Sequence, residues 1–595
     1  MRDFFTQFLS SAGQRFVPFR AWLGDLKNPR VLRADIIAGI TVALVLVPQA
    51  MAYAQLAGLP PHIGLYASFL VPIVAAIFGS SRQLQNGPVA IISLMTAAAL
   101  VPLGLPAEEL VVYAALLALL AGVIQLVLGF LRLGVLVDFL SHPVVIGFSS
   151  AAAIVIASLQ LDKLFGIDNP RTEHLYESLI NLARAIPTQT HLPSLIMGVA
   201  TLVILLGFKK FAPKLPGMVA AMVLATLASW LLGYEAMGAK VVGEIPKGLP
   251  SFSVPDVDLK HVRSLFVPAL LIALLSFVEA FSIAKAVASR TRQRISADQE
   301  MVGKGLANLT AGFMSGYPVS GSFSRTAVAF EAGAKTGFTA IISGVLVGLT
   351  LLFFTALLYH LPIASLAAVI IVSVIGLFQP RQILHTWKVQ KHDGLIAFTV
   401  FIATLSFAPH LEAGIFIGVT MSLTFYIYQT MRPHFAEVAL DHDGAYRNAD
   451  KFGLQTSDTV AIYRYDGDLY FVNSGYLEKR ILNSVAKKPQ LSVILLDLEA
   501  VSHIDATGEE MLSHLSERIK AAGIELYITR AKFMVTDVFK RSGLYSKIGE
   551  DHFFAKRITA IQHIQKEYGD EIDVEPFLLN IPLERDDEAS EPAAF

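Results

Sequence analysis

One short stretch of the sequence, YPVSGSFSRTAVAF at residues 317–330, combines hydroxyl groups and a guanidinium group within a very hydrophobic region. The hydroxyls belong to Ser320, Ser322 and Ser324, and the guanidinium belongs to Arg325. Pro318 and Gly321 interrupt the backbone before this arginine. Because each of these polar side chains can donate a hydrogen bond or carries positive charge, the chemistry that they favour is the binding of an anion.

The apolar segment that follows Arg325 is too short to cross a bilayer, which needs roughly 20 helical residues. We therefore expect a half-helix that begins inside the membrane, with free backbone N–H groups and a positive dipole at its N-terminus. Arginine suits a tetrahedral oxyanion because its guanidinium gives two parallel hydrogen bonds. The alternative is that Arg325 extends to the membrane surface or forms a permanent ion pair.

Glu279 is a carboxylate inside the otherwise apolar segment FVPALLIALLSFVEAFSIAKAVA. An ionised carboxylate is costly in hydrocarbon, so we expect it to face the interior of a helix bundle and to have a partner. Burial favours the neutral acid and a nearby arginine favours the carboxylate, which together permit proton uptake and release during transport. The alternative is a structural ion pair with Lys285 or Arg325.

Polar side chains also occur in the first hydrophobic segment, VPQAMAYAQLAGLPP. Gln49 and Tyr53 are one helical turn apart and share a face of the expected helix. They could line a substrate pocket, although ordinary hydrogen bonds between helices would explain each residue alone.

The composition is that of a membrane protein with many spans and an additional soluble part. The chain has 595 residues, of which 54% are hydrophobic and 16% charged, whereas soluble domains carry about 25% charged residues. A net charge of −1 gives no indication of nucleic-acid binding. Cysteine is absent, and we find no P-loop, no HExxH pattern and no triad, so we expect neither an enzyme nor a cofactor, metal or ATP-driven pump.

Fourteen apolar segments organise residues 35–431. They are 35–55, 62–79, 88–101, 109–131, 142–160, 192–208, 216–233, 264–288, 299–313, 322–331, 337–359, 362–378, 393–409 and 412–431. Basic residues follow the even-numbered segments, which places both termini in the cytoplasm of a multi-pass protein of the cell inner (plasma) membrane. Residues 1–34 form a basic, amphipathic segment that we expect on the cytoplasmic membrane surface.

The two halves of this region match each other in one feature. Asn86, Gly87 and Pro88 stand at the start of the short third segment, and the serine–arginine stretch contains the start of the short tenth segment. Short segments interrupted by Gly or Pro at matching positions indicate a transporter built from repeats. With seven segments in each half, the repeats would be inverted, and the two half-helices would meet N-terminus to N-terminus.

After a linker at 432–452, residues 453–570 predict a soluble α/β domain, followed by an acidic tail at 571–595. The predicted strands are 459–465, 468–473, 491–498 and 523–529, and the predicted helices are 474–486, 508–521, 533–541 and 554–567.

The chain resembles the sulfate permease (SulP) family of anion transporters. The resemblance lies in VPQAMAYAQLAGLPPHIGLYAS (47–68), GPVAIISLMTAAAL (87–100), SFVEAFSIAKA (276–286), GSFSRTAVAFEAGAKTG (321–337) and LDLEAVSHIDATGEEML (496–512). It implies a polytopic α-helical membrane protein, with fourteen segments as a seven-plus-seven inverted repeat divided into core and gate domains. It also implies a cytoplasmic α/β STAS domain and a homodimer.

The resemblance further implies that substrate binds between the half-helices that begin near Pro88 and Ser322. The implied contacts are Tyr53, Ser324 and Arg325, with backbone N–H groups of both half-helices. Together with the residues singled out above, the candidate substrate-binding residues are Gln49, Tyr53, Pro88, Val89, Ser322, Phe323, Ser324 and Arg325. Glu279 falls where proton-coupled plant sulfate transporters keep an acidic residue. Sodium-coupled bicarbonate members lack the arginine, so Arg325 argues against that branch.

In the STAS domain, HIDATGEEM resembles a loop that is phosphorylated in anti-sigma-factor antagonists, and Thr507 occupies the phosphorylatable position. Thr507 is therefore a candidate regulatory residue. The reading that we favour is an unmodified helix cap, because Asp505 and Thr507 are both good capping types.

We thus expect secondary active transport of an inorganic oxyanion, sulfate above all, by proton symport and alternating access. The partners would be the anion, a proton, the lipid bilayer, a second copy of the chain and an unidentified cytoplasmic protein at the STAS domain. The alternatives are transport of bicarbonate or a C4-dicarboxylate, an uncoupled anion channel or exchanger, and a sensor of anion occupancy.

Overall fold

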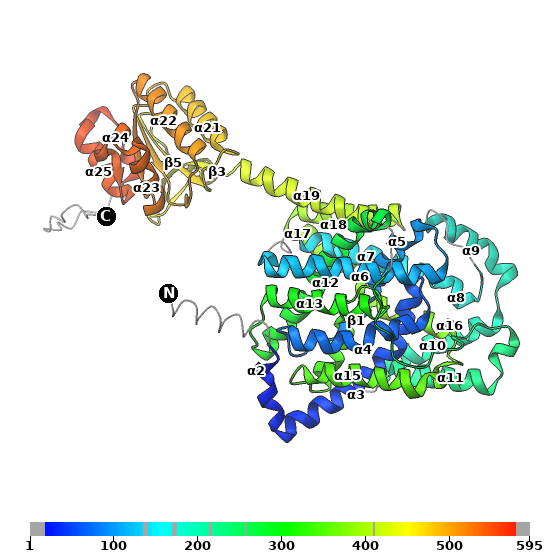
Figure 1. The fold of residues 1–595 in the computed structure, drawn as a ribbon. Coiled ribbons are helices and arrows are strands. Elements are labelled where there is room, and N and C mark those ends of the chain that lie inside the picture. Colours follow the sequence, from blue (N-terminus) through cyan, green and yellow to red (C-terminus); the bar gives the residue numbers. More distant parts are fainter. Residues whose placement is uncertain are drawn as a thin grey trace. The chain divides into compact units, whose positions relative to one another are not determined.

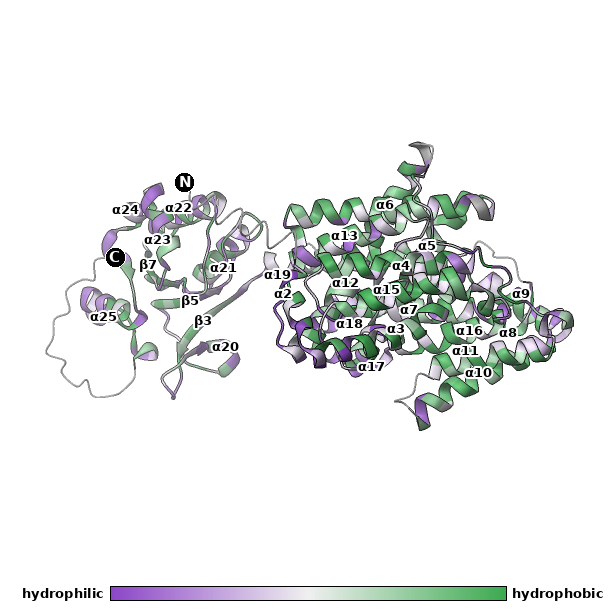
Figure 2. Cartoon of the chain, turned by 60° about the horizontal axis from the view of Figure 1, so that its bottom comes forward, coloured by the Kyte–Doolittle hydropathy of each residue, from purple (hydrophilic) through white to green (hydrophobic). Residues whose placement is uncertain are grey.

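The computed structural model describes residues 18–134, 141–168, 175–212, 217–255, 259–408 and 411–578. The chain divides into two compact units, Met1–Ser422 and Leu423–Phe595 (Figure 1). Residues 1–17 of the expected amphipathic N-terminus and residues 579–595 of the acidic tail lie outside the described residues. Figure 2 shows that hydrophobic residues dominate the helices of the first unit, as expected for a membrane domain.

Each of the fourteen expected apolar segments is helical, which confirms that part of the prediction. In the first half these helices are α3 Pro29–Leu56, α4 Pro61–Phe78, α5 Ala90–Leu100, α6 Ala107–Phe130, α7 His142–Ser158, α10 Leu192–Phe211 and α11 Gly217–Leu231. In the second half they are α12 Leu259–Thr291, α13 Ala297–Phe313, α14 Phe323–Glu331, α15 Phe338–Leu349, α16 Ile363–Val374, α18 Lys391–Phe407 and α19 Glu412–Met431. In the described part of the chain, eight helices are long and apolar enough to cross a membrane.

Shorter helices complete the first unit. They are α2 Arg20–Leu23, α8 Leu161–Phe165, α9 Leu175–Gln189 and α17 Pro380–Val389. Beyond α15 the chain continues as a π-helix, Thr350–Phe354, and a 3-10 helix, Thr355–Leu358.

The membrane helices pack in two groups. In the first group, α13 packs against α4 and α6, α12 packs against α6, and α15 packs against α3 and α4. In the second group, α7 packs against α18, and α10 packs against α11 and α16. The two groups correspond to the expected core and gate, and α3 contacts α16 and α11 between them.

Glycines allow close contact between α6 and α13 in the first group. A Cβ atom on Gly122 would lie 2.8 Å from the carbonyl oxygen of Gly305, and a Cβ atom on Gly305 would lie 2.9 Å from that of Gly122. Small residues at such interfaces let the backbones approach, since lipid gives helices no hydrophobic reason to associate. This packing fixes α13 beside the half-helices.

The second unit contains a six-stranded sheet in the order β4-β3-β5-β6-β7-β8. The strands are β3 His434–Leu440, β4 Tyr446–Asn448, β5 Val460–Asp466, β6 Val493–Asp497, β7 Glu525–Thr529 and β8 Phe553–Phe554. Its main helices are α21 Ser474–Lys487, α22 Ala506–Ala521, α23 Phe533–Ser542 and α25 Arg557–Tyr568. β5 to β8 are parallel, and buried apolar clusters cover both faces of the sheet.

Two sequence assignments in this unit differ from the structure. The expected linker 432–452 contains β3, which pairs with β5 and has four of its seven residues buried. The expected strand 468–473 is reduced to a single parallel bridge between Leu469 and Ile504, followed by a turn at 471–473. The Asn473 side chain accepts a hydrogen bond from the Tyr470 N–H and donates to the Asp468 carbonyl, at 2.9 Å each, and these local bonds form the turn.

Candidate functional site

A two-stranded ribbon brings the two half-helices together. β1 (Asn86–Gly87) pairs antiparallel with β2 (Ser320–Gly321), with Asn86 opposite Gly321. The Ser322 N–H donates to the Gln85 carbonyl oxygen at 2.8 Å. α5 and α14 begin directly after these strands, so their N-terminal ends lie on either side of one short ribbon. Segments more than 200 positions apart in the sequence thus meet at one place.

Arg325 lies on the first turn of α14 and is completely buried. Its Nη1 donates to Gln49 Oε1 at 2.9 Å. Its Nε and Nη2 have no hydrogen-bond partner among the described residues. A buried donor without a partner costs free energy, and a charged donor costs more than a neutral one. The guanidinium therefore offers two donors that an anion could accept.

Gln49 and Tyr53 of α3 complete one wall around this guanidinium. Gln49 Nε2 donates to the Tyr53 hydroxyl at 3.0 Å and approaches Ser324 Oγ at 3.5 Å. Gln49 and Tyr53 are both buried. The hydrogen bond to Arg325 thus fixes the amide of Gln49 between the arginine and the tyrosine.

The serines around the start of α14 have different roles. Ser322 is the N-cap, and its Oγ accepts a hydrogen bond from the Arg325 N–H at 3.3 Å. Ser324 Oγ lies 3.3 Å from Ser322 Oγ. Ser320 Oγ donates to the Ser276 carbonyl at 2.8 Å, so that hydroxyl is used within the protein.

The other expected contact residues differ in burial. Pro88 and Val89, which precede α5, are buried. The Phe323 side chain is 69% exposed, so only the backbone of this residue belongs to the buried end of α14.

Gly87 allows the guanidinium to approach β1. Its φ is +152°, and a Cβ atom there would lie 3.2 Å from Arg325 Nη2. We expect Gly87→Ala to displace the guanidinium and to raise the half-saturating anion concentration about tenfold, the equivalent of ~1.4 kcal/mol. Uptake by the purified protein in liposomes measures this.

Gly207→Ala is the matched control for that variant, because a Cβ atom there meets nothing within 4 Å. Equal half-saturating concentrations for the two variants would show that Gly87 does not control the arginine.

Glu279 lies on α12, is partly buried, and has an Oε2 atom without a hydrogen-bond partner among the described residues. Lys304 and Arg325 are the cations within electrostatic range of its carboxyl group. Lys285 instead lies over the Phe281 ring, with its Nζ 6.0 Å from the ring centre. In the described part of the chain, Glu279 forms no ion pair with Lys285 or Arg325.

Sequence analysis missed the polar face of α13. Lys304 is buried and donates to Asn86 Oδ1 of β1. Asn308 Oδ1 accepts the Val319 N–H at 2.8 Å, and Asn308 Nδ2 donates to Gln125 Oε1 at 2.8 Å. Glu300, Lys304 and Asn308 follow one another at intervals of four residues, so they share one helix face. That spacing was the signal that could have revealed them.

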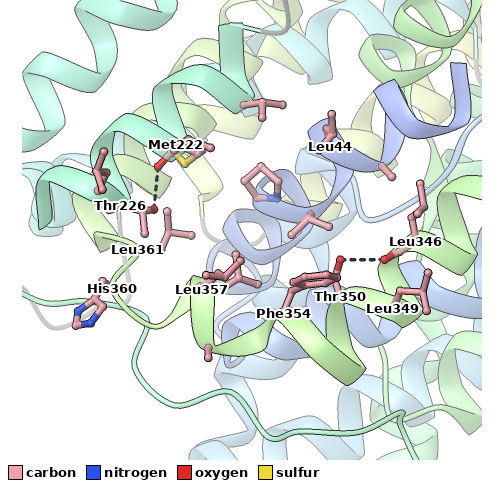
Figure 3. A pocket seen from close by; sticks show the side chains of 18 of the residues that line it. Leu44, Met222, Thr226, Leu346, Leu349, Thr350, Phe354, Leu357, His360 and Leu361 are labelled. Carbon is pink, nitrogen blue, oxygen red and sulfur yellow. Dashed lines mark hydrogen bonds between the residues drawn. The ribbon is translucent and has the colours of Figure 1, made fainter. Parts of the chain in front are cut away.

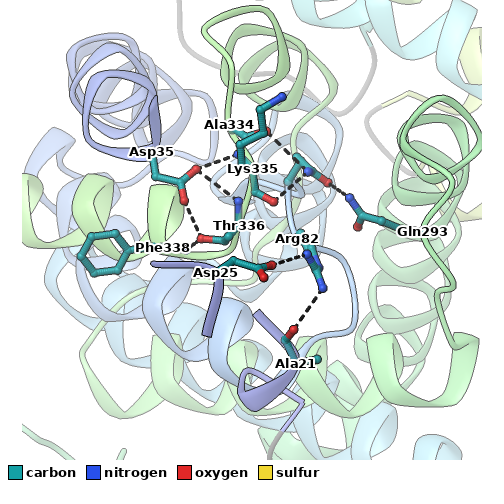
Figure 4. Close-up of polar contacts among 10 residues, drawn as sticks. Ala21, Asp25, Asp35, Arg82, Gln293, Ala334, Lys335, Thr336 and Phe338 are labelled. Carbon is teal, nitrogen blue, oxygen red and sulfur yellow. Dashed lines mark hydrogen bonds and ion pairs between the residues drawn. The ribbon is translucent and has the colours of Figure 1, made fainter. Parts of the chain in front are cut away.

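Asp35 of α3 holds the chain that leads from α14 to α15 (Figure 4). This buried carboxylate accepts hydrogen bonds from the Lys335 N–H at 2.7 Å, the Thr336 N–H at 3.1 Å and the Thr336 hydroxyl at 2.6 Å. A further bond comes from the Thr339 hydroxyl at 3.0 Å. Four donors satisfy the carboxylate without a cation, so its role is to anchor this connection to α3.

Two further polar contacts lie near the Asp35 hydrogen bonds in the same view. Arg82 Nη1 pairs with the Asp25 carboxylate at 2.8 Å, and Gln293 donates to Gln83 at 2.8 Å (Figure 4).

An apolar cavity of about 900 Å³ lies between α3, α11 and the segment from α15 to Leu361 (Figure 3). Leu44, Met222, Leu346, Phe354 and Leu357 are among its lining residues, and His360 lies at one end. Neither Arg325 nor Glu279 lines this cavity. Its chemistry does not suit an anion, so it is separate from the candidate site.

In the soluble unit, Asp505 is the N-cap of α22. Its Oδ1 accepts the Gly508 N–H at 2.8 Å and its Oδ2 accepts the Phe471 N–H at 2.8 Å. Thr507 lies within the first turn and is exposed. The structure thus gives the cap to Asp505 and leaves the Thr507 side chain on the surface.

We expect Asp505→Ala to lower the free energy of unfolding of this unit by about 1–2 kcal/mol, because two backbone donors lose their acceptor. Urea unfolding of a fragment of residues 433–578, followed by circular dichroism, measures the loss. Thr507→Ala is the control and should change the stability by less than about 0.5 kcal/mol. Equal losses in both variants would show that the cap is not the source of the effect.

Comparison with known proteins identifies the family. Residues 32–400 match the sulfate permease family and residues 451–560 match the STAS domain. The chain is 36% identical to "Sulfate transporter 4.1, chloroplastic" of Arabidopsis thaliana, over 92% of this chain and 82% of that protein. It is 33% identical to a probable sulfate transporter of Mycobacterium tuberculosis, over 90% of this chain and 96% of that protein.

Solved structures establish the fold. SLC26A9 aligns with a TM-score of 0.88 and 23% identity, over 94% of each chain. The transmembrane domain of the cyanobacterial bicarbonate transporter BicA aligns with a TM-score of 0.56 and 22% identity, over 67% of this chain and 98% of that chain. The helical unit with its paired half-helices, the soluble sheet and the two sequence matches together show that this multi-pass membrane protein belongs to the sulfate permease family of transporters and carries a C-terminal STAS domain.

Proposed function

We propose that the chain is a proton-coupled symporter of an inorganic oxyanion, with sulfate as its preferred substrate. The names of the relatives support sulfate. The observation that carries the proposal is the buried guanidinium of Arg325 beside the N-terminal ends of two half-helices, whose Nε and Nη2 have no hydrogen-bond partner in the part of the chain that the structure describes. Sulfate offers several oxygens with negative charge, which is what such a set of donors requires.

In this proposal the anion contacts Arg325 directly. Tyr53, Gln49 and Ser324 supply further hydrogen bonds, and the backbone near Val89 and Phe323 supplies the positive ends of the helices. Ser322 contributes by capping α14, and Pro88 contributes by ending the ribbon without an N–H group of its own. Closing the site around the anion replaces its water with fixed donors, so no donor needs to reorient during transport.

Glu279 is the proposed proton carrier. Its carboxyl group lies in a membrane helix, and Oε2 has no hydrogen-bond partner among the described residues. Lys304 and Arg325 are within electrostatic range, so the substrate can influence the charge state of this carboxyl group. A proton on Glu279 removes one negative charge next to the incoming anion. Anion and proton therefore favour each other's binding, which is the thermodynamic requirement for symport.

The moving parts are the two helix groups. The site lies on α3 and α12 of the first group and on α5 and α14, which pack against α3, and the second group provides the surface past which it moves. Movement of the first group would carry the anion between the two sides of the membrane. This account includes a homodimer, cytoplasmic termini, location in the cell inner (plasma) membrane, and a cytoplasmic STAS partner with Thr507 as a candidate site of regulation.

Competition separates sulfate from the other substrates that suit an arginine. We expect selenate, a tetrahedral divalent oxyanion, to inhibit labelled sulfate uptake at concentrations close to the sulfate half-saturation value. Bicarbonate, fumarate and succinate should need concentrations at least about tenfold higher, since they match the donors less well. Stronger inhibition by a dicarboxylate or by bicarbonate than by selenate would change the substrate assignment but not the assignment of the site.

A further inference from the structure

Lys304 is a buried basic residue that has no role in the symport proposed above. It lies on α13 with 2% of its surface exposed, and its Nζ donates to Asn86 Oδ1. Asn86 is neutral, so this hydrogen bond satisfies one N–H group without cancelling the positive charge. A lysine inside a membrane bundle is costly to keep and therefore suggests a function.

The charged groups that face Lys304 are few. Glu300 lies one turn earlier on the same helix, Glu279 is on α12, and Arg325 is on α14. Glu300 Oε1 accepts hydrogen bonds from the Ser80 N–H at 2.6 Å and the Ser80 hydroxyl at 2.9 Å, so it is already bound to the start of the 80–85 segment. In the described part of the chain, Lys304 forms no ion pair with either carboxylate.

Lys304 and Arg325 approach the ribbon at adjacent residues. Lys304 is bound to Asn86, and Arg325 Nη2 lies beside Gly87. Two cations therefore lie against the two residues of β1, directly before α5. Arg325 has two donor atoms there without a hydrogen-bond partner among the described residues, whereas the Lys304 ammonium donates one hydrogen bond to the ribbon itself.

Counting charge shows what the lysine changes. With Glu279 ionised, the negative charges of Glu279 and Glu300 cancel the positive charges of two cations, Lys304 and Arg325. The N-terminal ends of the two half-helices add roughly +0.5 each. With a proton on Glu279 the total rises to roughly +2, which matches a divalent anion. Without Lys304 the same protonated site would hold roughly +1, which matches a monovalent anion.

We propose that Lys304 is a specificity-determining residue that makes the site prefer divalent over monovalent oxyanions, acting through its field and not through contact. The inference rests on the proposed function and deepens it. Coulomb energy scales with the charge of the anion, so loss of the lysine costs a divalent anion twice the free energy that it costs a monovalent one. The fold-loss for a divalent anion should then be the square of that for a monovalent anion.

The test compares two competitors of labelled sulfate uptake by the full-length protein in liposomes, selenate as the divalent anion and nitrate as the monovalent one. In Lys304→Met, the ratio of the nitrate to the selenate inhibitory concentration should fall on the order of tenfold. Lys304→Arg keeps the charge and should stay within about threefold of the natural chain. Asn86→Asp keeps the lysine but pairs it with a carboxylate, and should reproduce the change of Lys304→Met.

The outcomes are distinct. An unchanged ratio in Lys304→Met and Asn86→Asp, with both competitors weakened equally, would show a purely structural lysine and overturn the inference. If nitrate inhibits neither the natural chain nor these variants, loss of the charge does not admit a monovalent anion, and the inference is overturned as well. If Lys304→Met does not fold, the ratio measured for Asn86→Asp alone decides whether the inference holds. A natural chain that takes up no sulfate at all would overturn the proposed function together with this inference, whereas sulfate uptake with an unchanged ratio would overturn only the role of Lys304.

Discussion

Replacing Arg325 by alanine is expected to abolish sulfate uptake at concentrations that saturate the natural protein. The guanidinium carries two unused donors in a buried place, and hydrogen bonds to charged groups contribute about 1.5–3 kcal/mol each. Losing both should weaken binding by about 100-fold or more. Labelled sulfate uptake into liposomes, measured over a range of sulfate concentrations, gives the result.

Two further observations separate binding from folding in that variant. Because Nε and Nη2 have no hydrogen-bond partner among the described residues, Arg325→Ala loses only the Nη1–Gln49 hydrogen bond and removes a buried charge, so the thermal unfolding midpoint should change little. Arg325→Lys keeps the charge but loses the parallel pair of donors, so it should give intermediate uptake. Normal uptake by a folded Arg325→Ala protein would contradict the assignment of the site.

Replacing Glu279 by glutamine is expected to remove the proton dependence of transport and to keep anion binding. Glutamine has the size of the neutral acid but cannot release a proton, so the site should remain in its anion-binding charge state. An inward proton gradient should then no longer drive accumulation above the external sulfate concentration. Sulfate-for-sulfate exchange, which needs no net proton movement, should continue.

Lys285→Met is the control for that experiment, since Lys285 is on the same helix and lies over the Phe281 ring. It should keep gradient-driven accumulation. Full accumulation by Glu279→Gln would return Glu279 to a structural role and favour an uncoupled pathway.

The Pro and Gly residues that interrupt the apolar segments predicted the membrane fold as much as the hydrophobicity of those segments did. Pro88 and Gly321 mark the two segments that are too short to span, and the structure pairs the residues beside them in one ribbon. Arg325, Gln49 and Tyr53 were chosen separately, and the structure links them by hydrogen bonds. The long motifs of the family suggested the remaining candidate site residues.

Sequence reasoning failed where polar residues are satisfied by distant backbone. Asp35, Lys304 and Asn308 were overlooked because hydropathy averages a helix over all its faces and hides one polar stripe. Their partners are loop and ribbon atoms that no local pattern identifies, such as the Thr336 N–H and the Val319 N–H.

In the soluble unit, β3 was missed for a related reason. HFAEVAL carries His434 and Glu437 among apolar residues and does not alternate cleanly, yet β3 pairs with β5 and its two faces pack into the apolar clusters on the two sides of the sheet. Local periodicity could not show a neighbour that lies beyond the β3–β4 hairpin. The strand also extends the soluble sheet into what the sequence suggested was a linker.

The most direct test of the account is sulfate accumulation by the purified natural protein in liposomes, with and without an inward proton gradient. The account predicts that the gradient drives labelled sulfate above its external concentration and that dissipating the gradient with a protonophore releases the excess. Equal uptake with and without the gradient, never exceeding the external concentration, would contradict proton symport and leave an uncoupled anion pathway.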